Sequence, residues 1–264
     1  MGASHAEVER KFELGEVSRP PDLVGIGGVD RIGEPVASEL EATYYDTPDL
    51  RLARHGATLR RRTGGHDAGW HLKLPRSDDE RLELAAPMNG DSDQVPTELL
   101  DMVRGRIGLR RLDAVATIRT TRVERDLLDA GGARLAVVAD DIVHARRSRH
   151  GSVDLIEWRE IEVELDRGGD ALLEEVTNRY RIDGLTRGDS RSKLHRVLGD
   201  DVRPSIPETG SKSADTLLGY LAEQVEAIVV GDARVPTRMS WTASSSSART
   251  RASPTTIAST CSAR

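Results

Sequence analysis

The sequence predicts an α+β fold in which an antiparallel β-sheet or barrel carries short helices on its outer side. Two observations indicate this fold. Segments with the residue types and two-residue alternation of strands fill much of residues 7–165, and several follow one another across a turn alone. Helical patterns are few and short, and they do not alternate regularly with strands as they would in parallel βαβ units.

The strand-like segments are separated by turn sequences rather than by long connections. Residues 64–67, Gly-Gly-His-Asp, and residues 129–132, Asp-Ala-Gly-Gly, have the composition of hairpin turns. Such short turns join antiparallel neighbours. Strands are expected near residues 7–11, 38–46, 57–63, 69–74, 81–86, 115–128, 133–145 and 152–165.

The helix-like segments carry recognisable start signals. Pro20 suits the first turn of a short helix, and Asp46 or Thr47 can cap the next one. Thr97 and Asp170 are the expected N-caps of two further helices. Helices are expected at residues 20–24, 48–54, 97–106, 170–180, 190–198 and 213–230.

The main domain is expected to span residues 3–202. The composition and the hydrophobic pattern of the chain change after it. Pro204 and Pro207 indicate a linker at 203–212. Residues 213–235 form an amphipathic helix with Leu217, Leu221 and Val225 at helical spacing. Residues 236–264 are rich in Ser and Thr and have almost no hydrophobic period, so we expect a disordered tail.

Composition narrows the functional class. The 264 residues are 37% hydrophobic and 31% charged, with a net charge of −6, which argues against a nucleic-acid partner. We expect no membrane association and no secretion, because the chain lacks a long apolar run and an N-terminal signal pattern. The single cysteine, Cys261, excludes an internal disulfide framework and a cysteine-based zinc site, and it favours a cytoplasmic location.

Charged residues recur at every second position of several predicted strands. Glu7, Glu9 and Lys11 share one face of the first strand, and residues 160, 162 and 164 are all glutamate. Arg60 and the other basic side chains lie on strands between these two acidic ones. Each strand taken alone is best explained as one solvated face of a sheet.

Taken together, the charged faces suggest a different arrangement. If they converge inside a closed barrel, the interior is a polar tunnel with an acidic side and a basic side. Clustered carboxylates suit Mg²⁺, and arginine and lysine side chains suit phosphate oxygens. Charge matching therefore predicts a site for a metal ion and several phosphates.

Short motifs in a fixed order match this hypothesis. The Glu7-Val8-Glu9-Arg10-Lys11 segment resembles the ExExK signature of CYTH-domain proteins, the triphosphate tunnel metalloenzymes. This resemblance implies an eight-stranded antiparallel barrel and extends over roughly residues 3–200. It is supported by the sequences at 44–50, 52–62, 70–73, 119–122, 140–141, 160–164 and 192–193.

The resemblance implies roles for individual residues. It implies that Mg²⁺ or Mn²⁺ is held by Glu7, Glu9, Asp141, Glu160, Glu162 and Glu164. It implies that a triphosphate is bound by Lys11, Arg60, Arg62, Lys73, Arg119, Arg122 and Lys193. Among these, Glu9, Lys11 and Arg60 are the expected catalytic residues.

Three details stay open at the level of sequence. Spacing favours Asp141 over Asp140 as the acidic residue of its strand, and Val137 stands where many relatives have a glutamate. His71 is given no catalytic role. The sequence does not decide the oligomeric state.

The implied activity is metal-dependent hydrolysis of a triphosphate, with inorganic triphosphate as the first choice. Adenylate cyclase and thiamine-triphosphatase activity are the enzymatic alternatives, and a noncatalytic polyphosphate-binding module is the third. Residues 211–235 resemble the first helix of a CHAD domain, a helical module associated with polyphosphate. The absence of further basic helices after this segment suggests a truncated or frame-shifted module, with a natural disordered tail as the alternative.

Overall fold

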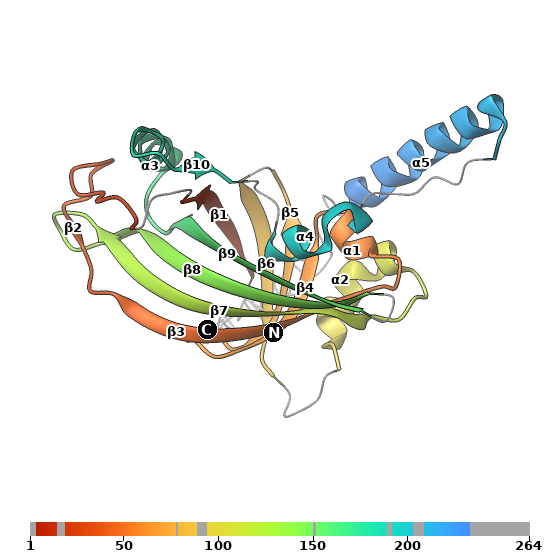
Figure 1. Cartoon of the computed structure of the whole chain (residues 1–264), viewed down its shortest axis with the longest axis horizontal. Helices are drawn as coiled ribbons and strands as arrows, with labels where there is room; N and C mark the ends of the chain where they lie inside the picture. The colour runs from red at the N-terminus through yellow and green to blue at the C-terminus, as the bar shows by residue number, and fades with distance from the viewer. Residues whose placement is uncertain are drawn as a thin grey trace, which may run out of the picture.

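Antiparallel strands form a closed barrel at the centre of the molecule (Figure 1). The computed structural model describes residues 4–14, 19–77, 79–88, 94–149, 152–188, 192–202 and 209–232. The barrel strands are β1 (Ser4–Glu13), β3 (Val36–Asp46), β4 (Thr58–Thr63), β5 (Gly69–Pro75), β6 (Glu80–Ala86), β7 (Asp113–Leu128), β8 (Arg134–Arg149) and β9 (Ser152–Leu165). These eight strands confirm the predicted antiparallel barrel.

The strand order explains how the barrel closes. It runs β1-β6-β5-β4-β3-β7-β8-β9, and β9 pairs again with β1, with Lys11 opposite Glu162. Two-residue strands extend the sheet, with β2 (Arg31–Ile32) on β7 and β10 (Thr186–Arg187) on β1. The first strand and the acidic strand β9 are therefore direct neighbours, although about 150 residues separate them in sequence.

Alternation along each strand sorts the side chains into two environments. The odd-numbered residues of β1, among them Glu7 and Glu9, line the interior, whereas Phe12 packs outward in the largest apolar cluster. In the same way Lys73 of β5 faces inward, while Leu72 packs outward. The prediction of a polar interior with apolar outer faces is confirmed.

Two helices cover the outer faces of the barrel. α2 (Thr97–Ile107) packs Leu99 and Val103 against the outer side of β4 and β5. α3 (Asp170–Ile182) packs Leu173 and Val176 against the outer side of β1, β8 and β9. These contacts bury the apolar side chains that alternate with the charged ones.

A third helical segment closes one end of the interior. α4 (Lys193–Leu198) and the 3₁₀ helix η1 (Gly199–Val202) pack on inward-facing apolar residues such as Ile118, Val143 and Trp158. Arg147 donates to the carbonyl of Leu198 at 2.9 Å and forms an ion pair with Asp201, which ties this segment to β8. The expectation that every helix packs outside is therefore corrected for α4.

Several predicted helix starts differ from the structure. Residues 20–23 have no regular secondary structure, and turns follow from Val24, where Gly25, Gly27 and Gly28 all have positive φ, so the predicted helix at 20–24 is not formed. Pro96 is the N-cap of α2, and Gly169 is the N-cap of α3, so neither Thr97 nor Asp170 caps its helix. α4 is described from its Ser192 cap onward, and residues 190–191 of the predicted helix lie outside the described residues.

The two residues predicted to cap the next helix, Asp46 and Thr47, do bind the backbone of α1 (Arg51–Arg54). The buried carboxylate of Asp46 accepts hydrogen bonds from the backbone N–H groups of Leu52 and Ala53 at 2.8 and 2.9 Å. The Thr47 hydroxyl accepts from the Arg51 N–H at 3.0 Å. Both predicted residues therefore satisfy N–H groups of this short helix.

The C-terminal helix α5 (Lys212–Asp232) projects from the barrel beyond α1 and α2 (Figure 1). Its Leu217, Leu221 and Val225 are exposed. Most of the expected linker, at 203–208, and the expected tail at 236–264 lie outside the described residues. In the described part of the chain, no helix is both long and apolar enough to cross a membrane.

Candidate functional site

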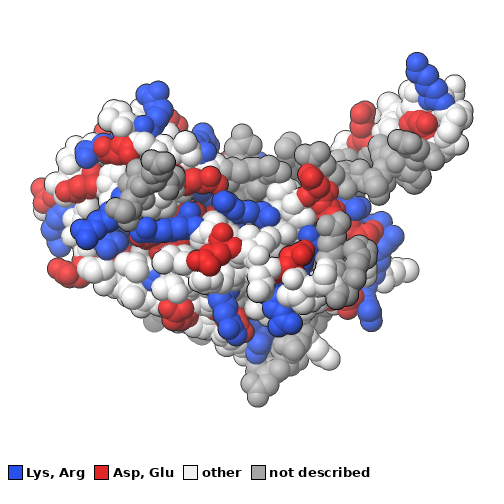
Figure 2. Space-filling view, in the orientation of Figure 1, with Lys and Arg blue, Asp and Glu red and all other residues white. Residues whose placement is uncertain are grey.

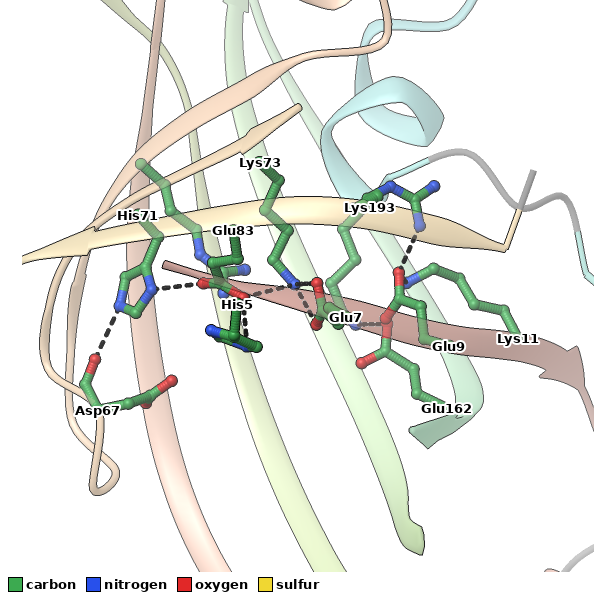
Figure 3. Close-up of polar contacts among 12 residues, drawn as sticks. His5, Glu7, Glu9, Lys11, Asp67, His71, Lys73, Glu83, Glu162 and Lys193 are labelled. Atoms are coloured by element: carbon green, nitrogen blue, oxygen red, sulfur yellow. Dashed lines mark hydrogen bonds and ion pairs between the residues drawn. The ribbon is translucent and has the colours of Figure 1, made fainter. Parts of the chain in front are cut away.

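The barrel interior contains a polar cavity of about 310 Å³ that is lined by side chains from most of the strands. Figure 3 shows how side chains from β1, β5, β6, β9 and α4 point toward one another within it. Figure 2 shows that acidic and basic groups are interspersed over the outer face seen in Figure 1. The charged lining consists of Glu7, Glu9, Lys11, Arg60, Arg62, Asp67, Lys73, Arg81, Glu83, Arg122, Glu124, Glu162, Glu164 and Lys193.

A cluster of three buried carboxylates lies beside this cavity. One oxygen each from Asp141, Glu160 and Glu162 lies within 4.8 Å of the others. The Lys193 ammonium contacts all three, at 2.9, 2.6 and 2.8 Å respectively. Burial opposes the charge on Lys193, but Asp141 and the two glutamates raise its pKa well above its usual value.

This cluster fits a hard divalent cation. Oxygen ligands from several carboxylates are what Mg²⁺ and Mn²⁺ prefer, although a bound ion would compete with the Lys193 ammonium for these oxygens. Glu162 is buried, yet the ammonium groups of Lys11 and Lys193 and the Arg122 guanidinium hold its pKa well below its usual value. The carboxylate is therefore ionised and able to act as a ligand at neutral pH.

The carboxylates of β1 are paired with cations from neighbouring strands. Lys73 donates to both oxygens of Glu7 at 2.5 Å, and Arg81 donates to Glu9 at 2.8 Å. Lys11 lies 3.4 Å from Glu9 and also forms an ion pair with Glu162. Lys11 thus connects the acidic residues of β1 to the carboxylate cluster.

Three arginines form the basic side of the tunnel. Arg122 donates to both oxygens of Asp141, at 2.7 and 2.6 Å, and Arg62 forms an ion pair with Asp67 near the rim. Arg60 has the Tyr44 hydroxyl as a partner at 3.4 Å, and no described carboxylate lies within ion-pair distance of it. Burial, followed by the neighbouring Arg60 and Arg122, lowers the pKa of Arg62 to about 9. Arg60, Arg62 and Arg122 therefore hold their positive charges close together in this part of the tunnel.

Comparison with known proteins agrees with this geometry. The CYTH domain family matches residues 5–198, which include all of the barrel and α4. The chain belongs to the CYTH family.

Similar proteins are found both by sequence and by structure. The uncharacterized proteins Rv2226 and MT2285 of two Mycobacterium tuberculosis strains are each 40% identical over 245 residues, covering 88% of this chain and 48% of theirs. The chain thus spans about half the length of the curated relatives it matches. A crystal structure of a proposed adenylate cyclase from Bacillus halodurans has a TM-score of 0.50 at 20% identity, covering 74% of this chain and 99% of that one. This likeness shows the shared fold.

The structure brings most of the residues expected from the CYTH resemblance into the tunnel or its carboxylate cluster, with one clear exception. Arg119 faces outward on β7, where its side chain is 73% exposed and donates to Glu41 at 2.6 Å. Arg119 and Arg122 are three positions apart, so the two-residue period of a strand places them on opposite faces. The prediction that Arg119 contacts the substrate is therefore corrected.

The choice between the two aspartates of β8 is also decided. Asp141 faces inward and is fully buried, whereas Asp140 faces outward and accepts two hydrogen bonds from Arg159.

Val137 shares the inward side of β8 with Asp141 and lies opposite Glu164. Burial and the nearby carboxylate of Glu7 raise the pKa of Glu164 to about 7. Glu164, like Glu7 and Glu9, is not part of the three-carboxylate cluster found among the described residues.

Strand β6 supplies two tunnel residues that the sequence analysis did not single out. Arg81 pairs with Glu9, and Glu83 lies 2.6 Å from Nδ1 of His71 and 3.4 Å from Lys73. His71, to which no catalytic role was given, thus faces the tunnel beside Lys73. The sequence contains a pattern that could have indicated them. Arg81 and Glu83 alternate with leucines just as the charged residues of β1 and β9 alternate with apolar ones.

Proposed function

We propose that this protein is a metal-dependent triphosphatase and that its substrate is inorganic triphosphate. One observation carries the proposal: a group of neighbouring guanidiniums lines the barrel cavity, next to a cluster of three carboxylates. An anion with several charges would pair with Arg60 and the cations around it, and a divalent cation would bind the carboxylates.

The dimensions and lining of the tunnel favour an inorganic chain of phosphates. A volume of about 310 Å³ lies at the small end of the range for ligand sites. The described lining residues include no tryptophan or phenylalanine, and the ring of Tyr44 is buried in an apolar cluster, so little aromatic surface is available for a nucleotide base to stack on. We therefore propose hydrolysis of inorganic triphosphate as the main activity, with ATP cyclisation and thiamine triphosphate hydrolysis as alternatives.

Each side of the tunnel has a distinct task in the proposed reaction. Asp141, Glu160 and Glu162 would hold Mg²⁺ or Mn²⁺, with Glu7 and Glu9 as further proposed ligands. When bound, the ion would neutralise phosphate charge and lower the pKa of water. Arg60, Arg62, Arg122, Lys11, Lys73 and Lys193 would bind and orient the phosphate oxygens.

The closed strand wall limits access of bulk water, so these contacts act in a site of low dielectric constant. Although burial opposes its charge, Lys11 is the main cause of a lowered pKa at Glu9. The ionised Glu9 carboxylate is thus suited to orient the attacking water, and Lys11 and Arg60 to stabilise charge on the phosphate.

A noncatalytic polyphosphate-binding module is the second candidate. Two observations favour it: Val137 stands on the inner side of β8, and all three clustered carboxylates contact Lys193. Both features would weaken metal binding while leaving the basic side of the tunnel intact. We also propose that residues 3–202 are the triphosphate tunnel domain and that 213–235 begin a CHAD-like helical module.

One set of assays distinguishes these functions. The protein is incubated with tripolyphosphate, ATP or thiamine triphosphate, with Mg²⁺, Mn²⁺ or EDTA, while phosphate and cyclic AMP are measured. We expect metal-dependent phosphate release that is fastest with tripolyphosphate. Tripolyphosphate binding by calorimetry without turnover under any metal condition would reject the enzyme and support the binding module.

A further inference from the structure

A second cavity lies on the outside of the barrel, away from the tunnel. It has a volume of about 770 Å³ and lies between the segment 19–32, the outer faces of β7–β9 and α3. Its residues Arg125, Asp140 and Arg159 belong to the opposite sheet face from Arg122 and the carboxylate cluster. The cavity is thus separated from the tunnel by the thickness of the sheet.

A buried hydroxyl without a partner lines this cavity. Tyr180 of α3 is fully buried, and its ring packs edge-on against Phe12 at a centroid distance of 4.9 Å. Its hydroxyl has no hydrogen-bond partner among the residues the structure describes. Buried polar groups are nearly always hydrogen-bonded, and leaving one unpaired is costly. The Tyr180 hydroxyl is therefore a donor available to a ligand.

A cation without a counter-ion lines the same cavity. Arg125 of β7 lines the cavity together with Tyr180, and it makes no ion pair with any carboxylate in the described ranges. The neighbouring Asp140 and Arg159 neutralise each other through two hydrogen bonds of 2.8 and 2.7 Å. Arg125 thus contributes an uncompensated positive charge next to an unpaired donor.

The remaining walls combine apolar and charged side chains. Leu23, Ile32, Leu127 and Val138 line the cavity together with two prolines of the 19–32 segment. The same segment adds Arg19, Asp22, Asp30 and Arg31, two basic and two acidic residues. Apolar walls with a few convergent polar groups are typical of small-molecule sites. They would contact the body of a ligand, while the polar groups would hold its charged end.

We propose that this outer cavity binds a small organic anion. Its phosphate or carboxylate group would accept hydrogen bonds from Arg125 and from the Tyr180 hydroxyl, and its apolar body would pack against Leu23 and Val138. The proposal is independent of the function assigned to the tunnel, because none of these residues lines the tunnel.

Phenyl phosphate is a suitable probe, since it combines a phosphate with a flat apolar body. Calorimetric titration of the full chain is expected to show saturable binding that is weaker for inorganic phosphate. Tyr180→Phe and Arg125→Gln should each weaken binding of phenyl phosphate roughly tenfold or more, because each removes a hydrogen bond to a charged group. The tunnel variant Arg60→Gln should leave that binding unchanged.

The thermal midpoint of Tyr180→Phe provides an independent readout. Because the hydroxyl has no partner in the protein, its loss should leave the midpoint unchanged or higher. A lower midpoint would show that the hydroxyl has a structural partner, and the proposal would be wrong. Lack of binding up to about 10 mM phenyl phosphate, or binding lost in Arg60→Gln but kept in both outer-cavity variants, would equally overturn it.

Discussion

Replacement of Arg60 by glutamine tests the proposed role of the tunnel most directly. Arg60 is half-buried in the tunnel wall, and it has the Tyr44 hydroxyl rather than a carboxylate as its described partner. Its charge also contributes, after burial, to the lowered pKa of Arg62. Burial opposes the charge of Arg60 as well, but Tyr44 and the carboxylates of Glu83 and Glu7 raise its pKa, so its surroundings offset that repulsion even without a ligand.

The structure predicts a larger effect on binding than on stability. Loss of the Arg60 charge relieves repulsion on Arg62 but also removes attraction to Glu83 and Glu7, so the thermal midpoint of the protein alone should change little. Binding of tripolyphosphate should weaken, because a hydrogen bond to a charged group contributes about 1.5–3 kcal/mol. That range corresponds to a dissociation constant about 10- to 150-fold higher.

Calorimetric titration with tripolyphosphate and a thermal melt of each variant measure the two effects. Arg119→Gln is the matched control, since Arg119 is exposed on the outside of the barrel and its surface ion pair contributes little. Its affinity for tripolyphosphate and its midpoint should both equal those of the unmodified protein. Equal losses of affinity in the two variants, or a marked drop in the midpoint of Arg60→Gln, would contradict a binding role for Arg60 in the tunnel.

Three further outcomes follow from the structure. Glu160→Gln should weaken Mn²⁺ binding in a calorimetric titration roughly tenfold or more, whereas Glu157→Gln, exposed on the same strand, should not change it. Asp46→Ala removes the acceptor for the backbone of α1 and should lower the free energy of unfolding, measured in urea, by about 1–2 kcal/mol. Arg147→Met leaves the carbonyl of Leu198 without its donor and should cost about 1–3 kcal/mol in the same measurement; an unchanged value would mean that α4 does not depend on this contact.

Alternation within single strands made much of this site predictable. Charges at every second position of β1 and β9, with apolar residues between them, require one polar and one apolar face whatever the rest of the fold does. The CYTH motif order added the expectation that the polar faces converge. Arg81 and Glu83 of β6 carry the same signal, and they were missed only because their segment is short and has no distinctive motif.

Other features depended on the tertiary structure. A motif containing both Arg119 and Arg122 does not reveal which of them faces inward, and two adjacent aspartates present the same ambiguity. Strand register resolves both, because a shift of one residue exchanges the two faces. The helix pattern of α4 likewise gave no indication that its apolar residues would pack inside the barrel and bring Lys193 to the carboxylates.

Strands with one charged and one apolar face could be predicted from the sequence alone, because that property is local to each strand. Only closure of the barrel places the charged faces of these strands in the interior. It also brought Lys11 of β1 against Glu162 of β9, and it left Arg125 and Tyr180 together on the outside. These juxtapositions depend on pairing between distant segments, and pairing is decided by the combined burial of all strands and helices rather than by any one of them.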